Sequence, residues 1–555
     1  MAEDKEPALT EIARTLLELR YLARNQEGDI VETPSRMFHR VARAVAEADR
    51  IFFPNSPIHE LVDRFEQSMA GLSFLPNTPC LINAGRPMGQ LAACFVLPVE
   101  DNLESIFQTL KDTALIHQSG GGTGFSFSRI RPRGDTIFPA HGTSGGPVAF
   151  IQLFDAATHI IDRKQVRPGA NMGVLRAGHP DIREFIRIKT SPQQLQNFNL
   201  SVAVDDFFLE CLEKGCGYPL KHPRTGAVME TVYAETLWEM MAESAWKCGD
   251  PGILFVDRLN RGNPTPRLGS IEATNPCGEQ PLLPYEACTL GSINVTRFLE
   301  NGRINYERLQ KEVELAVHFL DNVVEINRYP LARIDEWSRT NRKIGLGIMG
   351  FADALILMGI PYESKEALNM ADELMAAIRD FAGEASARLA EKRGSFPAFN
   401  HSIYPAAGTR RRRNAALTTI APTGSISLIA GVSSGIEPVF AYRSKRRLMD
   451  RVVEDVHPVF DRCQRNGRPV PKEIFQTAWD VSPDWHLQIQ AAFQKHTENA
   501  VSKTVNCPAD ATAADIRRIF EQAARLPVKG VTVYRDRSRS DQTLCAVCEE
   551  CPRCG

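Results

Sequence analysis

Three cysteines in this chain stand among residues that could carry out redox chemistry on a substrate. Cys277 lies in the stretch Asn275-Pro-Cys-Gly-Glu279, two residues from an amide and two from a carboxylate. Cys288 follows eleven residues later, and Cys94 lies far upstream in Leu-Ala-Ala-Cys-Phe-Val. A single thiol beside a carboxylate is suited to nucleophile-and-base chemistry, and Pro-Cys-Gly alone is typical of a turn. Three thiols that converge, one reacting and two exchanging electrons, favour redox chemistry.

Three loops of small residues could bring backbone close to a ligand. Residues 421–427, Ala-Pro-Thr-Gly-Ser-Ile-Ser, follow a strand-like run; they predict either a phosphate cradle of backbone N–H groups or a capped strand-to-helix turn. Residues 120–124, Gly-Gly-Gly-Thr-Gly, lack the ending of a P-loop, so either close approach to a ligand or a helix end is expected. Residues 345–350 fit G-x-G-x-x-G, but the polar residues before them argue against a dinucleotide site and favour tight helix packing.

Four further cysteines form two Cys-x-x-Cys pairs at the end of the chain. They are Cys545, Cys548, Cys551 and Cys554. The spacing is compatible with thiol–disulfide exchange or with a bound zinc ion, although the loop of two residues between the pairs is short for a zinc knuckle. The other cysteines, such as Cys463, have no partner pattern and are interpreted as incidental thiols.

The composition is that of an ordinary soluble globular protein. The chain has 555 residues, of which 43% are hydrophobic and 24% charged, with a formal net charge of -2. This charge gives no reason to expect nucleic acid or an anionic membrane as a partner. The N-terminus has no apolar segment typical of a signal peptide, and no apolar run is long enough to span a bilayer. A cytoplasmic location is therefore expected.

Helical and strand patterns along the chain predict an α/β fold. Residues 8–52 have helical periodicity, and Thr33-Pro34 suits the start of a helix. Short apolar strands then alternate with amphipathic helices, which favours parallel pairing. We expect an N-terminal helical segment (1–69), a catalytic domain (70–535) and a mobile Cys-rich tail (536–555). The expected strands are 94–97, 124–127, 200–204, 292–295 and 417–420, and the expected helices are 103–118, 148–163, 231–247, 307–328 and 364–393.

In the order and spacing of several motifs, the chain resembles the catalytic subunit of ribonucleotide reductase. The similarity covers roughly residues 70–535, and its motifs are residues 75–85, Cys94, 120–124, 165–169, 275–279, Cys288 and 421–427. The resemblance implies the ten-stranded α/β barrel of that family, built from two antiparallel halves, with a finger loop that carries a radical cysteine.

The resemblance also implies a role for each motif residue. Cys277 becomes a thiyl radical that abstracts the 3′ hydrogen of a ribonucleotide, and Glu279 accepts the proton of the 3′ hydroxyl. Asn275 holds the substrate, while Cys94 and Cys288 supply the reducing equivalents and leave as a disulfide. The implied substrate pocket is lined by Thr78, Ala93, Gly122, Pro422, Thr423, Gly424, Ser425 and Ile426, where Ala93 replaces a serine common in relatives.

The radical source implied is adenosylcobalamin. The oxygen-dependent class has two adjacent tyrosines near its last barrel strand, whereas residues 530–538 contain only Tyr534. Nothing in the sequence resembles a glycyl-radical loop, and the Cys-rich tail is similar to that of the cobalamin-dependent class. The expected reaction is reduction of ribonucleotides, most simply diphosphates, for DNA synthesis. The alternatives are a large subunit that needs a separate radical-generating subunit and a nucleotide-binding relative without activity.

Control by a deoxynucleotide effector at a dimer interface is a further implication. Asp101, Asn102 and Arg131 match positions that take part in effector binding, and residues 163–172 match the loop that relays the signal. The partners implied are a second copy of the chain and a thioredoxin-like reductant that acts through the four tail cysteines.

Overall fold

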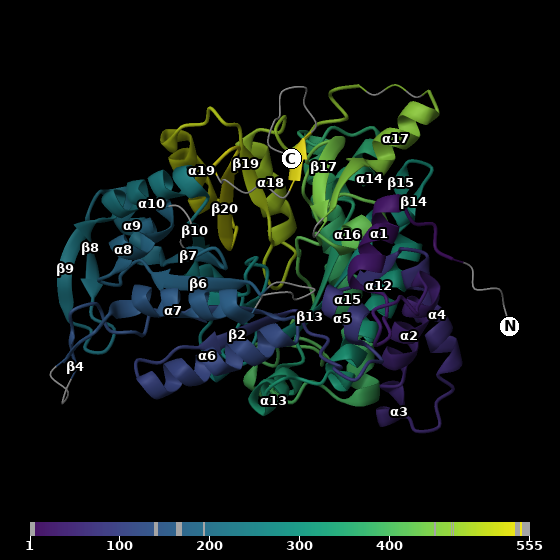
Figure 1. Ribbon diagram of the computed structural model, residues 1–555, viewed down its shortest axis with the longest axis horizontal. Coiled ribbons are helices and arrows are strands. Elements are labelled where there is room, and N and C mark those ends of the chain that lie inside the picture. Colours follow the sequence, from purple (N-terminus) through teal and green to yellow (C-terminus); the bar gives the residue numbers. More distant parts are fainter. Residues whose placement is uncertain are drawn as a thin grey trace.

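One large sheet with helices around it organises the protein (Figure 1). The structure, a computed structural model, describes residues 6–137, 142–161, 169–191, 195–448, 451–467, 469, 471–538 and 544–546. The sheet has ten strands: β1 (Phe74–Pro76), β2 (Cys94–Pro98), β3 (Gly122–Ser126), β6 (Asn171–Arg176), β7 (Phe198–Val204), β10 (Gly252–Phe255), β13 (Ala287–Asn294), β16 (Ile344–Met349), β19 (Thr504–Cys507) and β20 (Gly530–Arg535).

The strands fall into two halves that run in opposite directions. In the first half, β2, β3, β6, β7 and β10 pair in this order, and every pair is parallel. In the second half, β13 is parallel to β16 and β19 is parallel to β20. The halves meet in antiparallel pairs, β2 with β13 and β10 with β20. This confirms the expected α/β architecture with parallel pairing.

The second half is completed by two segments that carry only isolated bridges. Backbone hydrogen bonds join β16 to residues 416–420, and these residues bond in turn to residues 499–502, which lead into β19. The bridges Leu346 to Thr418 and Ile420 to Val501 are both parallel. The ladder therefore continues around the molecule and gives the expected barrel. The predicted strand at residues 417–420 occupies this connecting position.

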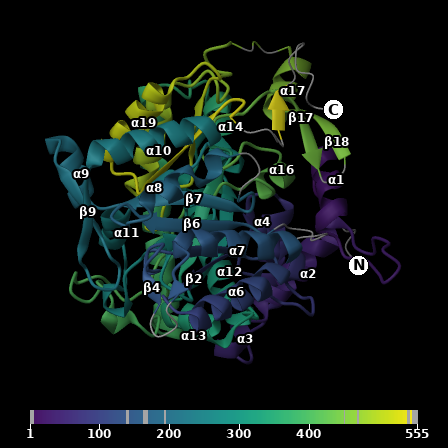
Figure 2. The same ribbon diagram turned by 60° about the vertical axis from the view of Figure 1, so that its left-hand side comes forward.

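Helices on the outside of the first half follow the sequence pattern closely. Asn102 caps α6 by accepting a hydrogen bond from the Ser105 backbone N–H, and Gly249 ends α10 in the left-handed conformation. Figure 2 shows α6 and α7 on the outside of the strands. The helices of this half are α6 (Leu103–Gln118), α7 (Gly146–Ile161), α8 (Ile182–Arg187), α9 (Asp206–Lys214), α10 (Ala234–Cys248) and α11 (Val256–Arg261), with a hairpin of β8 (Gly217–Lys221) and β9 (Val228–Tyr233).

The N-terminal helices pack on the second half of the barrel (Figure 1). Thr33 caps the second of these helices and accepts a hydrogen bond from the Arg36 N–H, which confirms the predicted cap. One continuous apolar core joins most helices of this side, which are α1 (Glu11–Arg20), α2 (Pro34–Ala46), α4 (His59–Ala70), α5 (Thr78–Asn83), α12 (Tyr306–Ile326), α14 (Phe351–Met358), α15 (Lys365–Arg393), α16 (Ile426–Ala430) and α18 (Pro483–Gln494). The short helix α3 (Asp49–Phe52) lies outside this core, and Ile334 of α13 (Ala332–Asn341) packs in the core of the first half. The helix α19 (Ala513–Arg525) packs instead against α10.

A buried cluster of charges connects these helices. The Asp321 carboxylate on α12 has no exposed surface and lies 2.7 Å from Arg342, 3.0 Å from Arg393 and 3.4 Å from Arg413. Burial alone would raise the pKa of Asp321, but the three guanidinium groups outweigh it and hold that pKa below its usual value. Arg393 also pairs with Asp49 of α3 at 2.7 Å. The cluster therefore links α12, α15 and residues 412–414 to the N-terminal helices.

A hairpin loop runs through the inside of the barrel. It consists of β11 (Ala273–Thr274), a turn at residues 275–280 and β12 (Pro281–Leu282). A Cβ atom on Gly124 of β3 would lie 1.7 Å from the Thr274 carbonyl oxygen, so only glycine leaves space for the loop. The glycine-rich run at 120–124 thus does allow a close backbone approach, but by the chain's own loop.

The glycines at 345–350 belong to a strand, and the expectation of tight helix packing was wrong. They lie on β16 and at its end, and a Cβ on Gly347 would come within 2.2 Å of the Thr419 carbonyl oxygen. Small residues here bring two neighbouring backbones of the barrel together.

A small sheet covers one rim. It contains β17 (Arg443–Leu448), β18 (Arg451–Val456) and, from the C-terminal tail, β21 (Leu544–Ala546), and α17 (Pro458–Arg465) follows it. The remaining strands form two short hairpins, β4 (Thr136–Ile137) with β5 (Gly142–Thr143) and β14 (Leu299–Glu300) with β15 (Arg303–Ile304).

Substitution of Gly124 by Ala tests the contact between strand and loop. The added methyl group collides with backbone, which cannot rotate away, so we expect a loss of about 1–3 kcal/mol in the free energy of unfolding. Gly383→Ala is the matched control, because Gly383 lies in α15 with no atom within 4 Å of the new Cβ. The control should gain about 0.5–1 kcal/mol. Urea unfolding measures both, and equal stability of the two variants would contradict the close contact.

Candidate active site

The turn at residues 275–280 is held by its own backbone and by the Asn275 side chain. The Gly278 N–H donates to the Asn275 carbonyl at 3.0 Å, and the Gln280 N–H donates to Asn275 Oδ1 at 2.9 Å. Asn275 Nδ2 donates to the Cys94 sulfur at 3.1 Å. One amide side chain thus fixes the turn and ties it to β2.

Three elements of the barrel anchor the loop from outside. Asn199 Nδ2, on β7, donates to the Pro276 carbonyl at 2.8 Å. The Glu279 carbonyl accepts from Thr419 Oγ1 at 2.9 Å and from the Ala500 N–H at 3.0 Å. Because both halves contribute, the tip of the loop is positioned by the closed barrel and not by the loop alone.

The side chains of the turn differ in their exposure. Asn275 and Glu279 are only 1% and 2% exposed, whereas Cys277 is exposed. The Cys94 sulfur lies 4.0 Å from Glu279 Oε1, a long thiol-to-carboxylate contact. The arrangement presents the Cys277 thiol outward and keeps a carboxylate, an amide and a second thiol together beside it.

Cys94 and Cys288 are directly opposite each other across the antiparallel pair of β2 and β13. Residues opposite one another in such a pair have Cα atoms roughly 4.5–5.5 Å apart, with side chains on one face. A disulfide needs a Cα separation of about 4.4–6.8 Å. These two thiols can therefore be joined without movement of the backbone.

The Cys288 thiol is buried, with charged groups of both signs nearby. Burial raises its pKa well above the ordinary value; Lys343 opposes this effect, and Glu279 and Glu286 add to it. Lys343 and Glu286 form a buried ion pair at 2.6 Å. Cys288 is thus kept as a neutral thiol near neutral pH.

A first cavity of about 240 Å³ brings the predicted residues together. It has the loop tip on one side and residues 421–426 on the other. The predicted residues that line it are Asn275, Cys277, Glu279, Cys94, Thr78, Ala93, Gly122, Pro422, Thr423, Gly424, Ser425 and Ile426. Cys288 lies behind Cys94 and outside the lining.

The loop at residues 421–425 has the geometry of an anion cradle. Thr423 adopts a positive φ of 53°, and its hydroxyl accepts a hydrogen bond from the Gly435 N–H at 2.7 Å. Within the described part of the chain, the N–H groups of Gly424 and Ser425 donate to no acceptor. Both residues line the first cavity, so these donors are available to a bound group.

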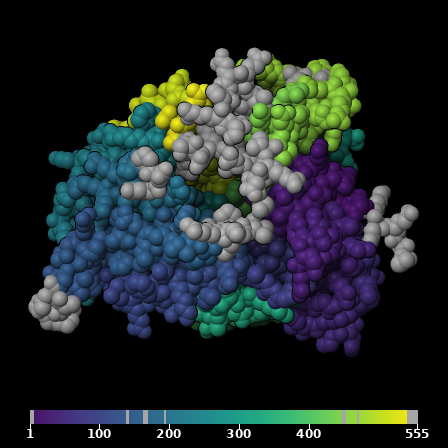
Figure 3. Space-filling view, viewed as in Figure 1, coloured from purple at the N-terminus to yellow at the C-terminus, as the bar shows by residue number. Residues whose placement is uncertain are grey.

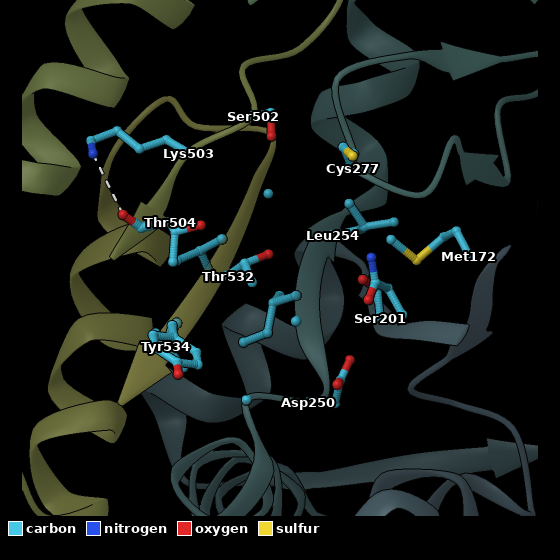
Figure 4. Close-up of a pocket in the computed structure, with 18 of the residues that line it drawn as sticks. Met172, Ser201, Asp250, Leu254, Cys277, Ser502, Lys503, Thr504, Thr532 and Tyr534 are labelled. Carbon is cyan, nitrogen blue, oxygen red and sulfur yellow. Dashed lines mark hydrogen bonds between the residues drawn. The ribbon is translucent and has the colours of Figure 1, made fainter. Parts of the chain in front are cut away.

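A second cavity of about 400 Å³ reaches Cys277 from a different side. In Figure 4, Thr532 and Tyr534 lie on one wall, and Met172, Ser201 and Leu254 lie on the other. Cys277 and Pro276 line both cavities. The face in Figure 3 is hollowed where the first half of the barrel (blue and teal) meets the second. Cys277 therefore stands between two separate spaces.

Not all residues predicted from the sequence lie at the loop. Arg131 Nε donates to both oxygens of Asp101, at 3.1 and 2.9 Å, and Asn102 caps α6. Asp101 and Arg131 line a cavity of about 1030 Å³ at the carboxyl ends of the first-half strands, the opposite mouth of the barrel. The relay loop at 163–172 is described only from residue 169 onward.

Of the tail, the structure describes residues 536–538 and β21. There the backbone of Cys545 pairs with that of Lys445 on β17. Cys548, Cys551 and Cys554 lie outside the described residues.

Several residues of the two cavities carry no signal in the sequence. Arg20 and Asn77 line the first cavity, and Asp250 and Lys503 line the second. Arg20 ends a helix, Asn77 caps one, and Asp250 and Lys503 lie just before β10 and β19, whose pairing the sequence does not reveal. The Asn-Thr-Pro sequence at 77–79, a helix cap, is the one local signal that could have identified Asn77.

An internal loop with an exposed thiol, inside a barrel of two antiparallel halves, is the architecture of nucleotide reductases, and the comparisons agree. The family model described as "Ribonucleotide reductase, barrel domain" matches residues 92–534, and "Ribonucleotide reductase, all-alpha domain" matches residues 8–89. The chain belongs to the ribonucleotide reductase family.

Curated relatives are similar over nearly the whole chain. A "Vitamin B12-dependent ribonucleoside-diphosphate reductase" of Mycobacterium tuberculosis is 46% identical over 97% of this chain and 81% of its own length. A protein of the same name from Thermoplasma acidophilum is 42% identical over 97% of this chain and 80% of its own length. The "Ribonucleoside-diphosphate reductase subunit alpha" of Chlamydia pneumoniae is 26% identical over 86% of this chain and 54% of its own length.

None of the described helices has the length and apolarity needed to cross a bilayer. Among the described residues, no cluster of three or more histidine, cysteine, aspartate or glutamate side chains could hold a metal ion.

Burial predicts which thiols react with an alkylating agent. Cys277 is exposed, whereas burial raises the pKa of Cys288 well above its ordinary value and that of Cys80 to about 12. Alkylation requires the thiolate, so at pH 8 both buried thiols should react at least ~10-fold more slowly than Cys277. Their rates should rise with pH up to the raised pKa values. Iodoacetamide labelling with peptide mass spectrometry measures these rates. Equal labelling rates of Cys277 and Cys288 would contradict the difference in burial between the two thiols.

Proposed function

We propose that this protein reduces ribonucleoside diphosphates to 2′-deoxyribonucleoside diphosphates by a thiyl-radical mechanism that depends on adenosylcobalamin. The observation that carries the proposal is the position of Cys277, exposed at the tip of an internal loop and shared by two cavities. The relatives named vitamin B12-dependent ribonucleoside-diphosphate reductase supply the substrate class and the cofactor.

The residues of the first cavity suit the steps on the substrate. With Cys277 as a thiyl radical, the sulfur takes the 3′ hydrogen atom, and Glu279 accepts the proton of the 3′ hydroxyl. The 2′ hydroxyl then leaves as water. Cys94 and Cys288 together provide two electrons and two protons and become a disulfide. Glu279 returns its proton to the 3′ oxygen, and Cys277 returns the hydrogen atom to the 3′ carbon. The sum is a ribonucleotide plus two thiols giving a deoxyribonucleotide, water and a disulfide.

The position of each group supports this assignment. Glu279 is only 2% exposed and lies beside Cys94, where a carboxylate can act on a bound hydroxyl with little competition from solvent. Asn275 already fixes the turn, so its amide is held in a defined orientation towards the cavity. The cross-strand pairing of Cys94 with Cys288 suits the formation of a disulfide.

The second cavity fits the reactive end of the cofactor. It opens beside Cys277 and is lined by polar groups that could bind a nucleoside, among them Ser201, Asp250, Thr532 and Tyr534. Adenosylcobalamin, when bound, supplies the carbon-centred radical that takes the hydrogen atom of Cys277. Pro276, Cys277 and Pro422 line both this space and the first cavity, and among them only Cys277 carries a thiol that can pass a hydrogen atom from one to the other.

The tail suits reduction of the disulfide after each turnover. Cys94 and Cys288 are buried, which excludes a protein reductant from direct contact. The pairing of β21 with β17 places part of the tail on the rim of the barrel. We assign residues 536–555 to a redox tail that a thioredoxin-like protein reduces. Zinc bound by the four tail cysteines is the alternative. The domain boundaries at residues 69 and 535 stay a prediction. Undiminished turnover with thioredoxin after all four tail cysteines become serine would contradict the redox role.

A homodimer with an effector site fits the outer surface of the first half. Leu103 and Phe107 on α6 and Ile160 on α7 are large apolar side chains with 64%, 52% and 70% exposure, and the two helices pack together. Such a patch is typical of an interface. Asp101, Asn102 and Arg131 stand at the start of this region and remain the proposed effector residues. A monomer in analytical ultracentrifugation, with and without deoxynucleotide, would contradict this assembly.

Reduction of CDP by the purified chain tests the function. We expect dCDP to form in the absence of oxygen, with dithiothreitol, only when adenosylcobalamin is added. Product without the cofactor would refute the cobalamin assignment. Binding of CDP with no product under either condition would favour the alternatives, a large subunit that lacks its radical-generating partner or an inactive relative.

Substitution of Cys277 by Ser tests the central residue. The hydroxyl has nearly the same size but cannot form a comparable radical, so turnover should fall at least ~10³-fold while CDP binding stays within about twofold. Cys463→Ser is the control, because Cys463 lies on α17 and lines neither cavity. Activity of the Cys277 variant near that of the control would remove Cys277 from the mechanism.

A further inference from the structure

The first cavity contains one basic side chain, and it comes from the N-terminal helices. Among the residues that line the cavity, Arg20 is the only one with a positive charge and Glu279 the only one with a negative charge. Arg20 is the last residue of α1, far in sequence from the barrel. No motif of the sequence identified it.

Helix packing holds Arg20 beside the hydroxyl loop. Helix α1 packs against α16, which begins directly after residues 421–425. At the far end of the contact, Thr10 Cγ2 lies 3.5 Å from the position of a Cβ on Gly431. The start of α1 thus meets the end of α16, and this antiparallel arrangement brings the end of α1 towards the start of α16 and the loop.

The neighbour of Arg20 fixes the helix end to the cavity wall. Tyr21 is fully buried, and its hydroxyl forms a hydrogen bond of 2.9 Å with Thr78 Oγ1. Thr78 itself lines the cavity. The backbone from which the Arg20 side chain extends is therefore tied to the same wall as the substrate residues.

The Arg20 guanidinium has a donor group that is available to a ligand. Its Nε is buried and has no hydrogen-bond partner among the described residues. A buried donor without an acceptor costs free energy, and a phosphate oxygen would satisfy it. Gly424 and Ser425 offer backbone N–H groups to the same space.

We propose that Arg20 binds the diphosphate of the substrate and sets the preference of the cavity for a charged nucleotide. The inference rests on the proposed function and adds to it a residue from outside the barrel. The neutral N–H groups of the loop can donate to any phosphate oxygen, whereas a guanidinium adds charge and a fixed fork of donors. The first cavity is then completed by α1, and the substrate spans from Arg20 at one end to Glu279 at the other.

The simpler alternative gives Arg20 a structural role. A basic residue in the last turn of a helix interacts favourably with the helix dipole and with the last carbonyl groups. In that case its removal would weaken α1 and affect every ligand of the cavity alike. A comparison of charged and uncharged ligands separates the two roles.

Binding of CDP and of cytidine to the full-length chain, measured by calorimetry, tests the proposal. We compare wild type, Arg20→Gln, Arg20→Lys and the control Arg14→Gln, since Arg14 is exposed on the same helix. Arg20→Gln should weaken CDP binding by about 10- to 100-fold and leave cytidine binding unchanged. Arg20→Lys should lose less, because it keeps the charge, and it replaces Arg20→Gln if that variant fails to fold. The control should match wild type for both ligands.

Three other results would contradict the Arg20 proposal, the proposed function, or both. Unchanged CDP affinity in Arg20→Gln, or an equal loss for CDP and cytidine, would overturn the proposal. If wild type binds CDP but forms no dCDP with adenosylcobalamin, the proposed function fails while the Arg20 comparison stands. If wild type binds no nucleoside diphosphate, the Arg20 proposal falls as well.

Discussion

The inside of the barrel can hold a loop only where the strands around it lack side chains. At Gly124 the loop backbone occupies the space of a Cβ atom, and at Gly347 the neighbouring segment does the same. A protein interior is packed to crystal-like density, so space for a loop must be removed from the strands. The contact at Gly124 and the anchors from Asn199, Thr419 and Ala500 hold the irregular turn in one position. All of the proposed chemistry depends on that fixed turn.

The antiparallel relation of the two halves explains why distant motifs meet. At one mouth of the barrel, the amino ends of the first-half strands lie beside the carboxyl ends of the second-half strands. Gly122 and Cys94 begin strands of the first half, while residues 421–425 follow a strand segment of the second half. A loop at the carboxyl end of a second-half strand and the first residues of first-half strands therefore line the same cavity. Ligands of parallel sheets commonly lie at the carboxyl ends of strands, and at the first cavity only the second half follows this rule.

Local features were predictable from sequence, and relations between distant segments were not. The helix at 103–118 was predicted with both ends correct, because a capping residue and a clear apolar period define it. The cavity residues with motifs, such as Thr423 and Cys277, were also found in advance. The pairing of Cys94 with Cys288 depends on strand register, which no local pattern specifies. Arg20 has an ordinary helix-end sequence, and only the packing of α1 gives it a place in the cavity.

The buried carboxylate of Asp321 has a consequence for how the molecule comes apart. Its three arginine partners and the link from Arg393 to Asp49 join α3, α12, α15 and residues 412–414 in one desolvated network. Breaking any of these ion pairs would leave an uncompensated charge in the protein interior, which costs on the order of several kcal/mol. The N-terminal helices therefore belong to the same cooperative unit as the second half of the barrel. Amide protons on both sides of this network should exchange with solvent through one shared, global opening.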